Sequence, residues 1–207
     1  GLIIDVRDNG GGDQSGNAII AHLIESQVVR YHHRIRINDL LLQDREETFL
    51  DLEFDEHDLF TPYAARSVTP KAPLYKGKVY VLTSPKCFSA CDTFTSAMKE
   101  NHLATIVGEG TGGGTGTPYS FSLNYSGLSF RYSVAQGLTA VKKEYLEGVG
   151  TLPDIEIFPT KEERMKGEDQ QLVKAINCLA QDIGRSNLTS SDLQNIKMSP
   201  PQKDSFT

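Results

Sequence analysis

The strongest constraint on the fold is a serine that lies between an apolar run and an amphipathic run. Residues 79–82 (VYVL) are typical of a buried strand, and residues 93–100 (TFTSAMKE) have the apolar spacing of a helix. Between them, residues 87–92 (CFSACD) predict a sharp turn. Such a turn holds the Ser89 hydroxyl at a helix N-terminus, where unpaired backbone amides can stabilise an oxyanion.

Charge and composition exclude several classes of protein. The 207-residue chain carries a net charge of −6, which argues against nucleic acid as its main partner, because a surface that follows phosphates needs a basic excess. No run of about 18 apolar residues is present, so no membrane span is expected. Three cysteines are too few for a disulfide scaffold and lack zinc-ligand spacing with histidine. The sequence therefore predicts neither a metal site nor a cofactor.

Strands and helices alternate early in the chain and strands cluster later, which favours the α/β class with a mixed sheet. Residues 2–7 form a short apolar run that ends in the glycine-rich residues 8–12 (DNGGG), as expected for a strand followed by a turn. The next predicted strand alternates with period 2, and the residues that share one face are Val29, Tyr31, His33, Ile35 and Ile37. Residues 125–127 (YSG) predict the turn of a later hairpin.

We expect one core over residues 1–184. Within it, residues 39–73 are first acid-rich and then punctuated by prolines, which is typical of an insertion or a lid-like loop. Residues 185–207 are rich in Ser, Asn, Pro and Lys, which predicts a disordered tail. Because Gly1 lies inside what reads as a buried strand, we expect the chain to be the C-terminal part of a larger protein.

Two backbone segments can supply amides for an oxyanion hole. Ala90 follows the serine at the predicted helix start, and residues 9–12 offer amides with few side chains in the way. One donor from each segment would stabilise the oxyanion that forms when a serine hydroxyl attacks a carbonyl. The competing interpretation is that Ser89 merely caps the helix, as hydroxyl side chains often do.

Two further features surround the serine. Cys87 and Cys91 flank it, and although a disulfide or a redox-sensitive pair is conceivable, the pattern favours two small buried apolar side chains. The glycines between 110 and 116 lack the residues and spacing of a phosphate-binding loop. They indicate tight packing, or a mobile loop, beside the serine.

Three ordered motifs resemble the C-terminal processing (tail-specific) serine peptidases. They are GLIIDVRDNGGG at 1–12, SACD at 89–92 continuing to IVGEGT at 106–111, and VGTLPDIEI at 149–157 with DQQL at 169–172. The resemblance implies a crotonase-like α/β core of strand-strand-helix units. It also implies Ser89 as the nucleophile, with Ala90 and either Gly11 or Gly12 as oxyanion donors.

One departure from the family concerns the base. The bacterial members use a lysine in the glycine-rich segment, and its place falls on Gly114, which cannot accept a proton. Lys142 and Lys143 lie in another segment and match no motif. A subset of the family, including the tricorn core protease and the chlamydial protease-like activity factor, uses an upstream histidine and a glutamate instead. Glu147 occupies the place of that glutamate. The resemblance therefore implies a Ser/His/Glu arrangement in which Glu147 orients or polarises the other two catalytic groups.

The histidine is expected outside this chain. None of the five histidines present matches the upstream motif: His22, His32, His33, His57 and His102. His32 and His33 are neighbours in an alternating strand, so they cannot both face one site. We therefore expect the chain alone to be incomplete as an enzyme.

The resemblance implies a serine endopeptidase that cleaves unfolded or extended polypeptide through an acyl-enzyme, with residues 1–184 as the catalytic core. Its expected partners are the polypeptide substrate and the upstream segment that supplies the histidine; a homodimer is left open. The family favours an extracytoplasmic or secreted location. Two alternatives remain, an inactive fragment and a non-catalytic binding module for an apolar ligand or peptide on the same scaffold, which the missing lysine motivates.

Overall fold

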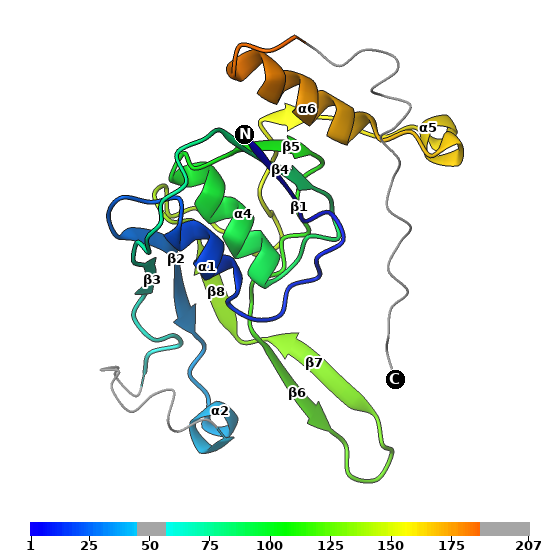
Figure 1. Ribbon diagram of the computed structural model, residues 1–207. Helices are drawn as coiled ribbons and strands as arrows, with labels where there is room; N and C mark the ends of the chain where they lie inside the picture. Colours follow the sequence, from blue (N-terminus) through cyan, green and yellow to red (C-terminus); the bar gives the residue numbers. More distant parts are fainter. Residues whose placement is uncertain (45–56, 187–207) are drawn as a thin grey trace.

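A four-stranded parallel sheet organises the fold, with the strand order β1-β4-β5-β9 (Figure 1). Its strands are β1 (Leu2–Asp5), β4 (Val79–Thr83), β5 (Thr105–Gly108) and β9 (Ile155–Glu156). The helices are α1 (Gly16–Ala21), α2 (Asp39–Asp44), α4 (Ala90–Glu100), α5 (Lys161–Lys166) and α6 (Gln170–Asp182). This computed structural model describes residues 1–44 and 57–186. Residues 45–56 of the predicted insertion and 187–207 of the predicted tail lie outside the described residues.

The central strand β4 is buried along its whole length, because both faces of the parallel sheet are covered. Val79 and Val81 point to one face, where they join the apolar cluster that includes residues of α1 and α4. Tyr80 and Leu82 point to the other face, where they pack with residues of α6. The period-2 geometry of a strand therefore gives each covering layer its own apolar set.

A three-stranded antiparallel sheet forms the next layer, in contact with α4, in the order β3-β2-β8. Its strands are β3 (Ala64–Val68), β2 (Val28–Ile35) and β8 (Ala135–Leu138). Helix α4 lies between the two sheets, and its residues from Cys91 to Met98 are all buried. The predicted α/β class with both parallel and antiparallel pairing is confirmed.

Strand β2 departs from simple alternation. A register shift between Val29 and Tyr31 marks a bulge against β3, and Arg30 is buried, with 1% of its surface exposed. Arg30 is the one buried residue of β2, and it donates hydrogen bonds to the first turn of α4.

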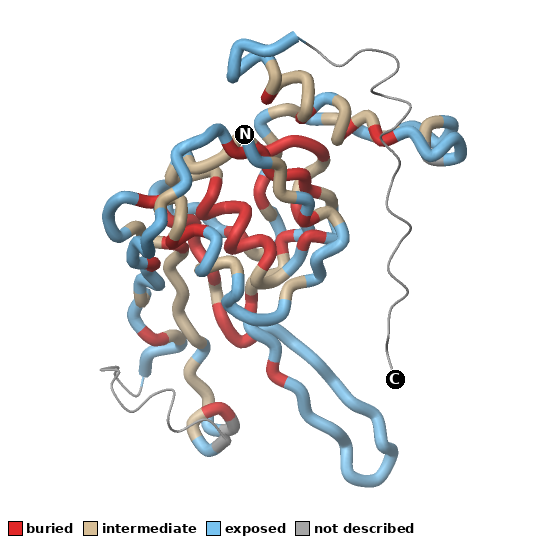
Figure 2. The backbone as a smooth tube through the Cα atoms, in the orientation of Figure 1, coloured by how far each residue is buried: buried red, intermediate tan, exposed pale blue. Residues whose placement is uncertain are grey.

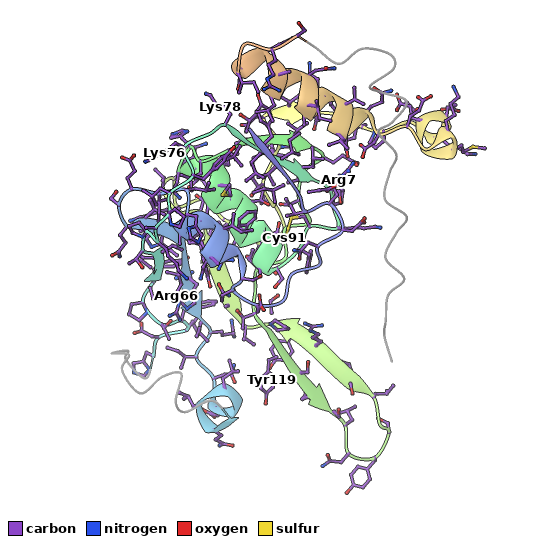
Figure 3. All side chains as sticks on the ribbon, in the orientation of Figure 1. Arg7, Arg66, Lys76, Lys78, Cys91 and Tyr119 are labelled. Carbon is purple, nitrogen blue, oxygen red and sulfur yellow. A yellow bond between two sulfur atoms is a disulfide. The ribbon has the colours of Figure 1, made fainter. Side chains whose placement is uncertain are left out.

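A two-stranded ribbon, β6 (Pro118–Ser122) with β7 (Ser129–Ser133), projects from the body, and Figure 2 shows most of it exposed. The predicted turn is confirmed, with Gly127 at a φ of +68°. Tyr119 is buried near the base of the ribbon with Leu41 and Val134, as its place in Figure 3 also shows. No helix in the described part of the chain is both long and apolar enough to cross a membrane.

Three loops leave the parallel sheet at the same edge. Because β1, β4 and β5 run parallel, the residues that follow them gather at their carboxyl ends, where sheets of this kind bind ligands. These loops are the glycine turn (residues 8–12), the serine turn (84–89) and the glycine-rich loop (109–116). The fold therefore brings together motifs that lie far apart in the sequence.

Candidate active site

The glycine turn packs directly against the serine turn. A Cβ atom built on Gly11 would lie 2.6 Å from the Ser89 Cβ and 3.0 Å from the Ala90 nitrogen. Gly11 also has a φ of +95°, a conformation that residues with a side chain rarely adopt. The Phe88 amide donates to the Asn9 carbonyl oxygen at 3.1 Å, which fastens the two turns together. This close approach explains why position 11 is a glycine.

Ser89 has an unusual backbone conformation, with φ at 57° and ψ at −117°. Positive φ is uncommon for residues other than glycine, and such conformations cluster at functional sites. The Ser89 side chain makes no capping hydrogen bond to α4. Because Ser89 is only partly buried and does not cap the helix, its hydroxyl is available for another role.

The amides of the predicted oxyanion donors differ in whether they already make a hydrogen bond. The Ala90 amide begins α4 and donates to no described group, and the same is true of the Gly12 amide. The Gly11 amide instead donates to the Asn9 Oδ1 at 2.9 Å, so it would have to exchange that bond for one to an oxyanion. Asn9 thus shapes this turn, although the sequence analysis did not select it as a site residue.

A small cavity of about 90 Å³ opens beside these groups. Its lining comes from the glycine turn, α1 and the start of α4: Val6, Asn9, Gly11, Asp13, Ser15, Gly16, Ile19, Ala90, Cys91 and Phe94. Gly11 and Ala90 therefore border this cavity, whereas Ser89 is not among the residues that line it.

A disulfide joins Cys87 to Cys91 and brackets the serine (Figure 3). Both cysteines are buried, and their Cα atoms are 5.4 Å apart, within the range that a disulfide requires. The preference for two unlinked apolar side chains is therefore wrong. The tight turn into a helix brings residues four apart close enough to bond, which sequence spacing alone did not reveal.

Asp92 attaches the glycine-rich loop to α4. Its carboxylate is fully buried and accepts hydrogen bonds from the Gly113 and Gly114 amides, each at 3.0 Å. A buried carboxylate requires such donors, because burial without them strongly disfavours its charged form. Asp92 therefore fixes the loop beside the serine turn, a role that the sequence analysis did not assign.

The Phe88 ring fills the space next to Gly114, where the bacterial family members have a lysine. A Cβ atom built on Gly114 would lie 1.7 Å from the ring's Cζ. No side chain fits at position 114 while the ring occupies this position. The packing thus gives a physical reason for the glycine.

Glu147 is hydrogen-bonded to the glycine-rich loop through Thr115. Its Oε2 accepts hydrogen bonds from the Thr115 amide at 2.6 Å and the Thr115 hydroxyl at 3.2 Å, and its Oε1 accepts one from the Ser133 hydroxyl at 2.9 Å. Within the described part of the chain it makes no hydrogen bond to Ser89. The structure thus brings Ser89, Ala90 and Gly11 together, with Glu147 connected to them only through the loop.

The histidine rings make their contacts elsewhere. His22, His32 and His33 contact the carbonyl oxygens of Pro73, Ala140 and Ala64, respectively. His102 follows the C-terminal end of α4, about 16 Å from the serine turn by the length of an 11-residue helix. His57 lies in the segment before β3. No group of three or more His, Cys, Asp or Glu side chains in residues 1–44 and 57–186 is arranged to hold a metal ion.

Comparison with known proteins shows the family and the fold of the chain. The sequence pattern of peptidase family S41 matches residues 1–157. The tricorn protease of Thermoplasma acidophilum is 22% identical over 197 residues, which cover 90% of this chain and 15% of that protein. A structure reported as a candidate peptidase of Parabacteroides merdae is 30% identical, with a TM-score of 0.68, and the match covers 86% of this chain and 51% of the other.

Mature CPAF complexed with lactacystin has the same fold, with a TM-score of 0.73 at 19% identity, over 88% of this chain and 44% of the other. The chain thus spans about half the length of these two solved structures and a smaller share of the tricorn protease. The family pattern matches well over half of the chain and includes both turns of the candidate site. The chain therefore belongs to peptidase family S41, whose members are serine-type hydrolases.

Proposed function

We propose that the complete protein is a serine endopeptidase that cleaves unfolded or extended polypeptide, with Ser89 as its nucleophile. The observation that carries this proposal is the contact between Gly11 and the turn that holds Ser89 at positive φ. A Cβ built on Gly11 would lie 2.6 Å from the Ser89 Cβ and 3.0 Å from the Ala90 nitrogen, and this closeness supports an oxyanion hole with amides from two different loops. Membership of a peptidase family supports the reaction class.

The proposed reaction is acyl transfer through a Ser89 ester. The Ser89 Oγ attacks the scissile carbonyl carbon while a base removes its proton, and the carbonyl π electrons move onto oxygen. The Ala90 amide and a glycine-turn amide bind that oxyanion; loss of one such donor typically lowers the rate by about 100- to 1000-fold. The base then gives the proton to the leaving amine as the C–N bond breaks. Water next hydrolyses the Ser89 ester and releases the acid.

The base in this proposal is a histidine supplied from outside this chain, since the rings of His22, His32 and His33 contact main-chain carbonyl oxygens. His102 follows the C-terminal end of α4, whereas Ser89 lies before its N-terminal end. Glu147 would accept a hydrogen bond from that histidine or hold the loop that receives it. Its carboxylate accepts three hydrogen bonds here, whereas a carboxylate can accept about four, which leaves room for one more donor.

A binding module without catalysis is the second candidate, because Phe88 occupies the space of the family's lysine. The peptidase function depends on the Ser89 hydroxyl, whereas a binding module does not need it. We expect Ser89→Ala to abolish hydrolysis of labelled casein by the full-length protein while its thermal unfolding stays close to that of the wild type. Hydrolysis that persists unchanged in Ser89→Ala would remove the peptidase proposal, and retained binding of peptide without any hydrolysis by the wild type would favour the module.

A further inference from the structure

Arg30 is a buried cation without a carboxylate partner among the described residues. Only 1% of its surface is exposed, and burial lowers the pKa of its guanidinium. A guanidinium nevertheless stays charged in proteins, so its burial is costly unless other groups compensate. A methionine or leucine would fill the same space without that cost. The presence of an arginine therefore calls for an explanation from its contacts.

The contacts of Arg30 reach two separate segments. One terminal nitrogen, Nη2, donates to the Ala90 carbonyl oxygen at 3.0 Å and to the Thr93 Oγ1 at 2.6 Å, both in the first turn of α4. The other, Nη1, donates to the Asn17 Oδ1 at 2.9 Å and also to the Gln14 Oε1. The second pair of acceptors lies just after the glycine turn, at the entrance to α1.

These two segments carry the two halves of the candidate oxyanion hole. Ala90 contributes one amide, and the glycine turn, which ends two residues before Gln14, contributes the other. No backbone hydrogen bond in the described part of the chain joins Gln14 or Asn17 to α4. The planar guanidinium has its donors in a fixed fork, so its four bonds add a rigid polar link between the two segments to the hydrogen bond from Phe88 to Asn9 and to the apolar packing of α1 on α4.

We propose that Arg30 is a positioning residue that holds the glycine turn and the first turn of α4 at the separation which an oxyanion requires. The inference rests on the proposed function, because it assigns a role in that same site. In the described part of the chain, no hydrogen bond joins Arg30 to the Ser89 hydroxyl or to the two amides. Its effect is therefore on the alignment of donors that are used in the transition state.

This role predicts a specific kinetic signature. Groups that stabilise mainly the transition state change kcat. Groups that bind the ground state and the transition state equally change KM. Since a displacement of about 1 Å can lower a rate by about 100-fold, we expect Arg30→Gln to lower kcat by about 10- to 100-fold with KM changed less than about threefold. Arg30→Lys keeps the charge but not the fork, so its kcat should lie between those of Arg30→Gln and the wild type.

The test uses full-length protein and labelled casein, with active sites counted by a fluorophosphonate probe so that unfolded molecules do not enter kcat. The matched control is Arg34→Gln on the same strand. Arg34 donates to the Gln136 Oε1 at 2.8 Å and lies over the Phe60 ring, away from both segments. We expect this control to keep kcat within about twofold of the wild type, as for a residue remote from the site. Thr93→Val, which removes one acceptor of Arg30, serves if Arg30→Gln does not fold.

The outcomes distinguish a failure of the Arg30 proposal from a failure of the proposed nucleophile. A kcat per counted site that is unchanged in Arg30→Gln, Arg30→Lys and Thr93→Val, with only lower thermal stability, would reduce Arg30 to a structural residue. A change in KM alone would also overturn the proposal. If instead the wild type is active yet the probe does not label Ser89, the proposed nucleophile has failed, and the Arg30 variants no longer bear on an oxyanion hole at that position.

Discussion

At the scale of single residues, the candidate site depends on two backbone positions that tolerate little change. Ser89 has positive φ, and Gly11 approaches it so closely that no side chain fits between them. Strain of this kind persists only where the surroundings hold it in place. Here the surroundings include the disulfide from Cys87 to Cys91 and the hydrogen bond from Phe88 to Asn9.

The first prediction concerns Gly11. In Gly11→Ala the new methyl group would meet Ser89 and Phe88 at 2.5 to 2.6 Å, so one of the two turns must move. We expect hydrolysis of casein to fall by more than about 100-fold and the free energy of unfolding to fall by about 1 to 3 kcal/mol. Gly10→Ala is the matched control, because nothing lies within 4 Å of a Cβ at that position. Equal activities of the two variants would contradict the account of this contact.

At the scale of elements, the site is formed where three adjacent parallel strands end. The sequence predicted these strands because their apolar runs are buried and bounded by turn residues, as in β4. It also predicted the serine turn, the glycine turn and α4. The residues alone suggested that the glycine turn and the serine turn meet, and the family resemblance supported it; the pairing of β1 with β4 and of β4 with β5 is a long-range property that the sequence pattern does not show.

Other features of the structure could not be predicted from the sequence, for physical reasons. Arg30 is buried against the first turn of α4, whereas a charged side chain in an alternating strand is expected on an exposed face. The strand β3 has few apolar residues and a largely exposed surface, so its periodicity is weak. Cys87 and Cys91 look like small apolar residues until the turn brings them together.

The second prediction concerns that disulfide. In the chain-entropy account, a bond that closes a loop of about five residues contributes about 2 kcal/mol to the free energy of unfolding. We expect Cys87→Ser to lower stability by about this amount in urea denaturation and to slow labelling of Ser89 by a fluorophosphonate probe. Cys178→Ser, which changes the free cysteine on α6, is the control. The prediction would be contradicted if Cys87→Ser unfolded at the same urea concentration as untreated wild type. The same holds if wild type treated with a dithiol reductant unfolded at that concentration.

At the scale of the whole molecule, α6 is held to the parallel sheet by apolar packing and by one ion pair at its start. Arg7, which follows β1 (Figure 3), donates to both carboxylate oxygens of Asp169 at 2.8 and 2.7 Å. Asp169 also caps α6 by accepting from the Leu172 amide at 3.0 Å. Burial alone would raise the pKa of Asp169, but the hydrogen bonds from Arg7 and Leu172 and the Arg7 charge lower it below its usual 3.8.

The third prediction follows from the sign of that shift. Because the folded state has the lower pKa, the contribution of Asp169 is complete above pH 3.8 and is lost as the pH falls below 3.8. At pH 7, Asp169→Asn should lower the free energy of unfolding by about 2 to 3 kcal/mol, and the variant should lose less stability than the wild type below pH 4. Asp8→Asn, which breaks an exposed pair with Lys86, should have little effect. Parallel acid unfolding curves for the wild type and Asp169→Asn would contradict this account.

The central claim is that the Ser89 hydroxyl becomes acylated beside amides from two loops. The most direct measurement is the reaction of the full-length protein with a fluorophosphonate probe, followed by mass spectrometric mapping of the labelled residue. We predict a single adduct on Ser89, formed at least about 100-fold more slowly in Gly11→Ala, whose turn is displaced. Labelling at another residue, or no labelling of a protein that hydrolyses casein, would contradict the claim.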